Sequence, residues 1–311
     1  MNLGEVSEGC RRRLVGHYGA AALEWVEEAP GLLQVAAARW GLSLMNYHDS
    51  GHASVVSTAV DQHGRQLMVK AWTDPARYRR EVAALRHWAG GPAVEVIETA
   101  DDLCVAALEM VGEEPGGRGR PVNELALVTE ALRRLHAVGR QPTLASFPLL
   151  ADYLRAEITP RIWKRLRDQD LGRWRPVAQA GLHALREAAG GHPAGAGNQT
   201  LLHGDLYREN VLFADVQQPV FLDPLPMLGS EAFDWAFWVV YYEVERGFED
   251  RLVLAQRVSG LSVQDIRRWC TVLFLDGLLY YLETEDPRAS LLGDTATAFV
   301  RNDEGRSSWS T

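Results

Sequence analysis

Lysine is almost missing from this chain of 311 residues, and the charge balance is acidic. Only Lys70 and Lys164 are lysines among 32 basic residues, so thirty are arginines, and 41 acidic residues give a formal net charge of -9. A nucleic-acid scaffold would normally present a basic face. We therefore expect no nucleic-acid partner, and an acidic surface that serves solubility and could also attract a cationic ligand.

Cysteine is equally scarce. Cys10, Cys104 and Cys270 lie far apart in the sequence and form no CxxC pair. An odd number of cysteines excludes a full disulfide framework, and reduced thiols are typical of the cytoplasm.

Long apolar runs are missing as well. Stretches such as Trp235–Tyr242 are too short to span a bilayer. The first residues, MNLGEVSEGCRRR, lack the apolar core of a signal peptide. We expect a cytoplasmic protein that does not associate with a membrane, and no protein partner is evident.

Three common catalytic motifs do not occur. The sequence contains no G-x-x-x-x-G-K-[ST] loop, no H-E-x-x-H pair and no G-x-S-x-G elbow, so P-loop, zincin and hydrolase chemistry lack support. A hydrophobic content of 47% in 311 residues is enough for a substantial core in one bilobal unit or two domains.

The most informative segment runs from residue 201 to 224 and reads LLHGDLYRENVLFADVQQPVFLDP. Short apolar runs alternate with polar loops, which predicts a strand, a loop, a second strand and a turn. Asp205, Asn210 and Asp223 would then stand at strand ends and face one point. Their oxygen atoms suit Mg²⁺, which prefers one or two carboxylates with phosphate oxygens and water.

The order of these groups is that of kinases, in which H-R-D-x-x-x-x-N is followed by D-F-G. Here the two parts are His203-Gly204-Asp205 with Asn210, and Asp223-Pro224-Leu225. This order predicts Asp205 as the catalytic base and Asn210 and Asp223 as Mg²⁺ ligands. Pro224 restricts the residue before it, so we expect an assembled site without a flipping segment.

Upstream, Gln66–Trp72 reads as an apolar strand interrupted by Lys70. This lysine matches the kinase lysine that holds the α- and β-phosphates. Burying it requires a paired acid, and Glu81 in the following helix, YRREVAALRHW, is the predicted partner.

The predicted strands Ser43–Tyr47 and Val55–Val60 would be joined by a turn that could cover nucleotide phosphates, with Gly51 and Ser54 as contacts. This turn has a single glycine, so an ordinary hairpin is the alternative. One or two helices are expected in residues 7–40, punctuated by Pro30–Gly31.

The segments HGDLYRENVL and FLDPLPMLGSEAFDW, with LEWVEEAPGLLQVAAARWGLSL upstream, resemble the aminoglycoside phosphotransferases. They are most similar to the branch of streptomycin phosphotransferases and related antibiotic-resistance kinases. The resemblance covers nearly the whole chain and implies an α+β, bilobal protein-kinase-like fold. A small N-terminal antiparallel-sheet lobe (residues 1–111) would be followed by a hinge (112–121) and a larger, mainly helical C-terminal lobe (122–311).

The resemblance also implies roles for residues that the spacing alone does not reveal. Backbone groups around Glu109 and Val111 would bind the adenine edge, and Asp234 would brace the catalytic loop by accepting its backbone N–H groups. We expect His203 to support the same loop through hydrogen bonds. Tyr207 stands where protein kinases have a lysine, which argues against a protein kinase.

The acceptor site is less defined. Trp238 and Tyr242 belong to an aromatic run whose rings could line an acceptor cleft, although burial in the second lobe explains much of the run. Asp276 lies within an apolar helix, where an acid needs a partner or a cleft, and is a candidate acceptor contact.

The sequence therefore predicts an ATP- and Mg²⁺-dependent O-phosphotransferase that inactivates an antibiotic such as streptomycin, with GTP not excluded as donor. Two alternatives remain open. The acceptor could instead be a nucleoside or peptide antibiotic or a small metabolite, which aromatic rather than acidic lining would favour. The chain could also be a nucleotide-binding kinase-like module without turnover.

Overall fold

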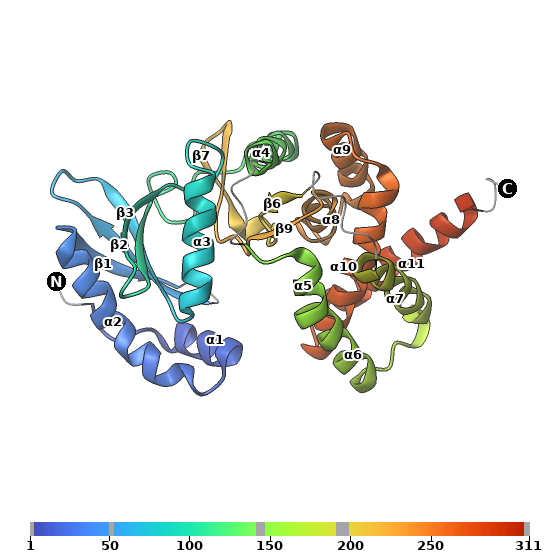
Figure 1. The fold of residues 1–311 in the computed structure, drawn as a ribbon, viewed down its shortest axis with the longest axis horizontal. Coiled ribbons are helices and arrows are strands. Elements are labelled where there is room, and N and C mark those ends of the chain that lie inside the picture. The colour runs from blue at the N-terminus through green and yellow to red at the C-terminus, as the bar shows by residue number, and fades with distance from the viewer. Residues whose placement is uncertain (1–2, 50–52, 141–146, 191–198, 308–311) are drawn as a thin grey trace. The chain divides into compact units, whose positions relative to one another are not determined.

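The computed structural model describes residues 3–49, 53–140, 147–190 and 199–307 (Figure 1). The chain divides into two compact units, Met1–Val138 with Val211–Leu225, and Gly139–Asn210 with Pro226–Thr311. The predicted fold class is confirmed, because an antiparallel sheet in the N-terminal region is followed by a mainly helical remainder.

The first unit contains one five-stranded sheet in the order β1-β2-β3-β5-β4, with every neighbouring pair antiparallel. Its elements are α1 (Glu8–Tyr18), α2 (Ala22–Arg39), β1 (Ser43–His48), β2 (Ser54–Val60), β3 (Gln66–Trp72), α3 (Pro75–His87), β4 (Val96–Ala100), β5 (Val105–Glu109), α4 (Glu124–Gly139, whose last residue belongs to the second unit) and the hairpin β7 (Val211–Asp215) and β8 (Gln218–Phe221).

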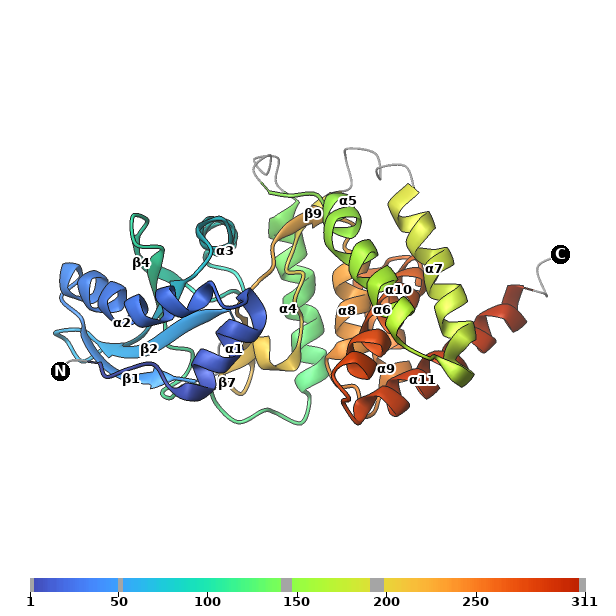
Figure 2. The same ribbon diagram turned by 90° about the horizontal axis from the view of Figure 1, so that it is seen from below.

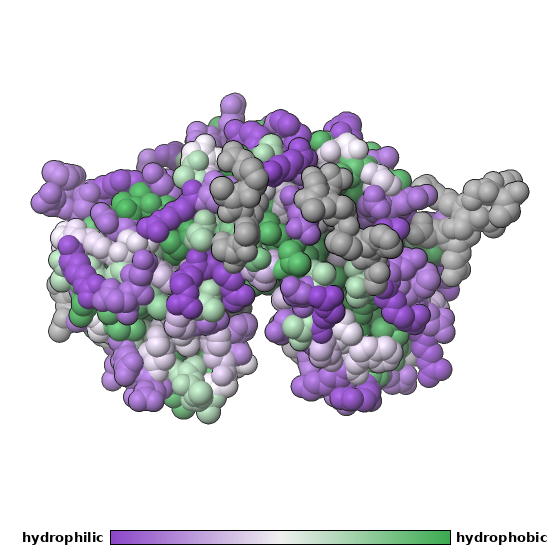
Figure 3. All heavy atoms as spheres, in the orientation of Figure 1, coloured by the Kyte–Doolittle hydropathy of each residue, from purple (hydrophilic) through white to green (hydrophobic). Residues whose placement is uncertain are grey.

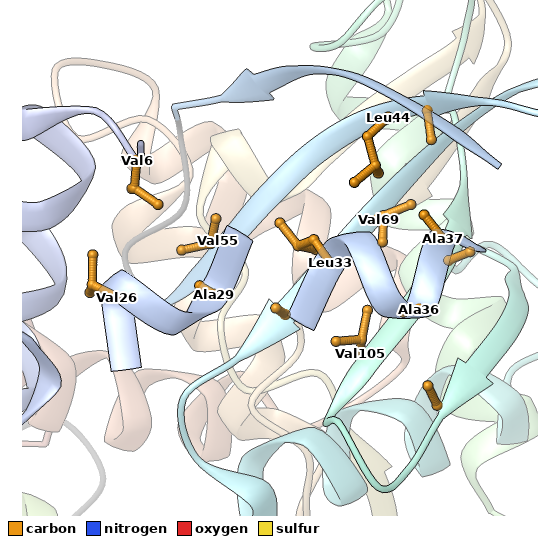
Figure 4. Packing of buried hydrophobic residues seen from close by; sticks show 14 of the residues in the cluster. Val6, Val26, Ala29, Leu33, Ala36, Ala37, Leu44, Val55, Val69 and Val105 are labelled. Carbon is orange, nitrogen blue, oxygen red and sulfur yellow. The ribbon is translucent and has the colours of Figure 1, made fainter. Parts of the chain in front are cut away.

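Side-chain alternation along β3 decides what lies on each face of this sheet. Val69 and Ala71 join the apolar core beneath α2, which includes Leu33 of that helix (Figure 4). Lys70, between them in the strand, therefore faces the other side. There α3 begins at Asp74, whose side chain accepts the N–H of Ala76, with Pro75 in the first helical turn.

The first helices differ from the prediction at one point. The break falls at Gly19, whose φ of 78° ends α1, and α2 runs through Pro30. An internal proline removes one helical hydrogen bond. Val26, Ala29 and Leu33 are all buried on the same helix, and this packing holds the segment helical despite the proline.

The segment 112–121 explains why the hairpin β7–β8 belongs to the first unit. The backbone N–H of Arg118 donates to the carbonyl oxygen of Phe213 at 2.8 Å. The guanidinium of Arg120 donates to the carbonyl oxygen of Val211, also at 2.8 Å. Gly117 has a φ of 72°, and a Cβ there would meet the Phe213 carbonyl oxygen at 3.0 Å, so the close approach depends on glycine. The expected lobe boundary assigned this hairpin to the C-terminal lobe, whereas the structure groups residues 211–225 with the first unit.

The second unit is mainly helical, with one short strand pair, β6 with β9. Its elements are α5 (Leu150–Tyr153), a π-helical turn (Leu154–Ile158), α6 (Thr159–Asp168), a 3₁₀ turn (Gly172–Trp174), α7 (Arg175–Gly190), β6 (Thr200–Leu202), a 3₁₀ turn (Arg208–Asn210), β9 (Met227–Gly229), α8 (Ala232–Tyr241), α9 (Phe248–Ser259), α10 (Val263–Glu283) and α11 (Arg288–Ser307). Helix α10 packs against α6, α7, α8 and α11 and is the centre of this unit (Figure 2).

Hydrophilic residues are spread over the surface of both units on the face drawn in Figure 3, with smaller apolar areas between them. Among the described helices, none combines the length and the apolar character needed to cross a bilayer. The cytoplasmic location stays a prediction.

Candidate functional site

The first group of predicted site residues lies on β3, α3 and the end of β8, all within the first unit. Nζ of Lys70 lies 2.6 Å from Oε1 of Glu81 and 2.8 Å from Oδ1 of Asp223. The Lys70 and Glu81 side chains are 5% and 0% exposed, whereas that of Asp223 is 42% exposed. The predicted Lys70–Glu81 ion pair is present, and Lys70 also reaches Asp223 on the more exposed side.

A tryptophan completes this group. Nε1 of Trp72 donates to Oε2 of Glu81 at 2.8 Å, and Nζ of Lys70 lies 4.6 Å from the centre of the Trp72 ring. Burial acts to lower the pKa of Lys70, but the carboxylates of Asp223 and Glu81 outweigh it and raise that pKa, so the lysine keeps its charge. A fixed buried cation of this kind can neutralise phosphate oxygens.

Asp223 has an unusual backbone. It follows β8 with a φ of 53°, a conformation that is uncommon outside glycine but tolerated best by aspartate and asparagine. The turn presents its half-exposed carboxylate beside Lys70. A carboxylate reached by water fits Mg²⁺, which keeps several waters and binds one or two carboxylates.

The second group lies in the loop after β6, in the second unit. The two strands that flank this loop do not pair with each other, because β6 pairs with β9 and β7 pairs with β8. The loop is instead fixed by Asp234 of α8, which accepts the backbone N–H groups of His203 at 2.8 Å and Gly204 at 2.9 Å. These are the hydrogen bonds expected of Asp234, and its role in holding the loop stays a prediction.

Two further contacts order the loop around Asp205. Its backbone N–H donates to Nδ1 of the fully buried His203 at 3.3 Å, which is the support expected of that histidine. The amide nitrogen of Asn210 donates to the backbone oxygen of Asp205 at 2.8 Å and to its carboxylate at 3.0 Å. Because the amide nitrogen faces Asp205, the Asn210 amide oxygen is the atom that a metal ion would take.

Replacing Asp234 with asparagine should loosen this loop. One oxygen could still accept an N–H group, but the new amide nitrogen would face the second donor in a fully buried position. We expect a loss of about 2 kcal/mol of unfolding free energy, since a hydrogen bond to a charged group contributes about 1.5–3 kcal/mol. Chemical denaturation of Asp234→Asn beside the wild type measures this, and an unchanged midpoint would contradict the bracing role.

The remaining nucleotide contacts stay predictions. Gly51 lies outside the described residues. Ser54 begins β2 and is 3% exposed. Glu109 ends β5 and its carboxylate accepts the N–H of Glu95 at 3.0 Å, while Val111, two residues on, is buried.

The acceptor predictions need correction. Trp238 and Tyr242 are 0% and 2% exposed, because α8 is buried around its whole circumference, so their rings belong to the core rather than to an acceptor surface. Asp276 has partners instead of a cleft. Its carboxylate binds Arg161 through two hydrogen bonds and Arg165 through one at 3.3 Å.

Sequence reasoning missed Trp72, Arg161 and Arg165. A signal for the arginines was present, because an acid inside an apolar helix requires a cation, and α6 carries basic residues four apart. Nothing in the local pattern indicated which helix would supply it. Trp72 lies two residues after Lys70 on the same face of β3, and strand periodicity could have suggested it.

The chain is similar to known antibiotic-resistance kinases. Residues 39–262 match the family model described as aminoglycoside/hydroxyurea antibiotic resistance kinase. Streptomycin 6-kinase of Streptomyces griseus is 24% identical over 248 residues, which cover 78% of each chain. Hydroxyurea phosphotransferase of Kitasatospora aureofaciens is 28% identical over 279 residues, which cover 88% of this chain and 78% of that one.

Solved structures show the same fold. A thermostable mutant of aminoglycoside phosphotransferase APH(4)-Ia, in a ternary complex with AMP-PNP and hygromycin B, has a TM-score of 0.61 at 19% identity and covers 88% of this chain and 99% of its own. An amicoumacin kinase in complex with AMP-PNP has a TM-score of 0.60 at 11% identity and covers 91% of this chain and 96% of its own.

Proposed function

Because the chain belongs to the aminoglycoside/hydroxyurea antibiotic resistance kinase family, and is thus an O-phosphotransferase, we propose that it moves the γ-phosphoryl group of ATP onto a hydroxyl group of an antibiotic. An aminoglycoside such as streptomycin is the first candidate acceptor, since two streptomycin 6-kinases are among the relatives. The added phosphate would inactivate the antibiotic.

The observation that carries this proposal is the fixed carboxylate of Asp205. Its loop is tied to Asp234 and Asn210 through hydrogen bonds, so the carboxylate is held before any acceptor arrives. A held carboxylate can orient an acceptor hydroxyl, which turns a bimolecular attack into an effectively intramolecular one.

The transfer forms a bond between the acceptor oxygen and the γ-phosphorus and breaks the bond to the β–γ bridging oxygen, whose electron pair stays on ADP. The acceptor proton passes late to the carboxylate of Asp205, because the transition state of phosphoryl transfer is loose. The side chain of Lys70, kept charged by Glu81 and Asp223, would hold phosphate oxygens in the first unit.

We propose Asp223 and Asn210 as ligands of Mg²⁺. The half-exposed carboxylate of Asp223 and the amide oxygen of Asn210 are the oxygen donors that this ion takes. When bound with the nucleotide, Mg²⁺ would neutralise charge on the phosphates.

The test is phosphate transfer from ATP with Mg²⁺ across a panel of hydroxylated antibiotics that includes streptomycin and hydroxyurea, with product masses read. A gain of one phosphate on a panel member, dependent on Mg²⁺, is the expected result. Mg²⁺-dependent binding of ATP without transfer to any acceptor would instead indicate a nucleotide-binding module.

A second candidate acceptor is hydroxyurea or a compound like it. The relative that phosphorylates hydroxyurea, by its name, is 28% identical to this chain, against 24% for the streptomycin kinases. These identities are too similar to decide between the two acceptors, so the distinction rests on the chemistry of the second unit.

A further inference from the structure

Four side chains of the second unit form a cluster that the proposed reaction does not yet use. We call Tyr153, Arg161, Arg165 and Asp276 the Arg161 cluster. Tyr153 ends α5, the arginines lie on α6, and Asp276 lies on α10, which packs against α6 (Figures 1 and 2). Such an ion pair, partly buried between two helices, calls for a reason beyond surface solubility.

The acid of this cluster is fully engaged. Oδ1 of Asp276 accepts from Nε of Arg161 at 2.9 Å and from Nη1 of Arg165 at 3.3 Å, and Oδ2 accepts from Nη2 of Arg161. Arg165 also donates to Glu283 at 2.7 Å. Two guanidinium groups thus balance two carboxylates, and no surplus negative charge arises here to attract an amino group of an acceptor.

Arg161 keeps donor capacity to spare. Its third hydrogen bond goes from Nη1 to Oη of Tyr153 at 3.4 Å, and among the described residues its other two N–H groups have no partner. The side chain is 37% exposed, compared with 10% for Asp276. The exposed part of the cluster is therefore a fixed cationic donor, suited to a carbonyl or another oxygen.

An aromatic chain connects this cluster with Asp205. Tyr207, two residues after Asp205 and 38% exposed, has its ring centre 5.5 Å from that of Tyr241. Tyr241 donates its hydroxyl to the Leu273 backbone oxygen of α10, and its ring lies over Gly277, where a Cβ would meet Oη at 2.6 Å. Asp276 is the neighbour of that glycine.

The pKa of Tyr207 agrees with this arrangement. Burial raises that pKa and the carboxylates of Asp205 and Asp276 act in the same direction, whereas Arg161 lowers it. Asp205 and the Arg161 cluster are thus both connected to the Tyr207–Tyr241 ring pair within the second unit.

From this arrangement we infer that Arg161 recognises the acceptor, donating to a carbonyl oxygen of an uncharged hydroxylated compound, and that the enzyme prefers such acceptors to polycationic aminoglycosides. This inference rests on the proposed function and names its acceptor class. Asp276 and Arg165 act by orienting Arg161, which corrects the expectation that Asp276 itself contacts the acceptor.

Two probe acceptors test the preference. Hydroxyurea is uncharged and carries a carbonyl beside its hydroxyl, whereas streptomycin is cationic. Wild type should show the higher kcat/KM with hydroxyurea. Arg161→Gln should raise the KM for hydroxyurea about 10- to 100-fold, the change expected from losing a hydrogen bond to a charged group, while the KM for ATP stays within about twofold.

A double variant distinguishes loss of acceptor binding from misfolding of Arg161→Gln. Arg161→Gln with Asp276→Asn removes the cation and the acid together, so no unpaired buried charge is left. It should show the same rise in KM for hydroxyurea. Arg155→Gln is the matched control, because Arg155 lies on the preceding turn, is 61% exposed and, among the described residues, pairs only with Asp152. It should behave as wild type.

The outcomes separate the two proposals. Transfer to streptomycin with a higher kcat/KM than to hydroxyurea, or an unchanged KM in both Arg161 variants, would overturn the inference and leave the proposed function standing. Binding of ATP without transfer to any acceptor would overturn the proposed function, and the inference with it.

Discussion

Asp205→Asn should lower kcat for phosphate transfer by about 10²- to 10⁴-fold, the range by which a positioned general base contributes. The substitution keeps size and hydrogen-bonding capacity, so the contact with the Asn210 amide can persist. An amide cannot take the acceptor proton. The affinity for ATP should be unchanged, because Lys70, Glu81 and Asp223 belong to the first unit.

The measurement is kcat with a saturating acceptor, beside the dissociation constant for ATP from titration. Asp168→Asn is a suitable control, because it makes the same chemical change at an exposed position at the end of α6 in the same unit. Retention of more than about a tenth of wild-type kcat in Asp205→Asn would remove this residue from the proton-transfer step.

Local signals predicted much of the candidate site. The strand around Lys70 and the helix carrying Glu81 are present, and the two side chains pair. This pair could be predicted because a buried charge requires an opposite charge, whereas the role of Asp234 came from the family resemblance.

The strand pairing around Asp205 could not be predicted from the sequence, for a physical reason. The segments flanking the loop look like one hairpin, since each is short and apolar. In the structure β6 pairs with a strand after residue 226, while β7 and β8 bind the first unit through backbone hydrogen bonds to residues 92, 94 and 118. Which strands pair depends on contacts between residues far apart in the sequence, and short apolar runs do not specify these contacts.

The acceptor side could not be predicted for a related reason. An aromatic helix such as α8 has no polar face, and only the surrounding helices show that Trp238 and Tyr242 are enclosed. The pairing of Asp276 with Arg161 spans 115 residues, and thirty arginines in the sequence offered too many partners. The large number of arginines thus prevented a prediction of the Asp276–Arg161 ion pair, which neutralises the charge of Asp276.

Lys70→Met should have the largest effect on stability. It removes the cation between two carboxylates and leaves Glu81 fully buried. In the part of the chain that the structure describes, its remaining polar partners are the N–H of Trp72 and the guanidinium of Arg77, 3.9 Å away. Breaking a buried pair by removing one partner costs about 3–5 kcal/mol. Phosphate transfer should be lost as well, because no other lysine lies in the first unit.

The cost of Lys70→Met should depend on pH in a definite direction. Burial raises the pKa of Glu81 above its ordinary value of 4.5, and the charge of Lys70 opposes this rise. Without Lys70 the pKa of Glu81 should therefore be higher still. A carboxyl with a raised pKa in the folded state binds its proton more tightly there than in the unfolded chain. The variant should therefore come closest to wild-type stability near pH 4.5 and lose stability as pH rises through the folded pKa.

Urea denaturation of both proteins at several values between pH 4.5 and 8 measures this difference. Lys164→Met provides the control, since it replaces the one other lysine of the chain at an exposed position on α6 and should match wild type throughout. A difference between Lys70→Met and wild type that stays constant with pH would mean that Glu81 does not take up a proton. In that case the carboxylate of Glu81 would remain charged without Lys70. The ion pair with Lys70 would then not be the interaction that stabilises this buried charge beside the proposed phosphate site.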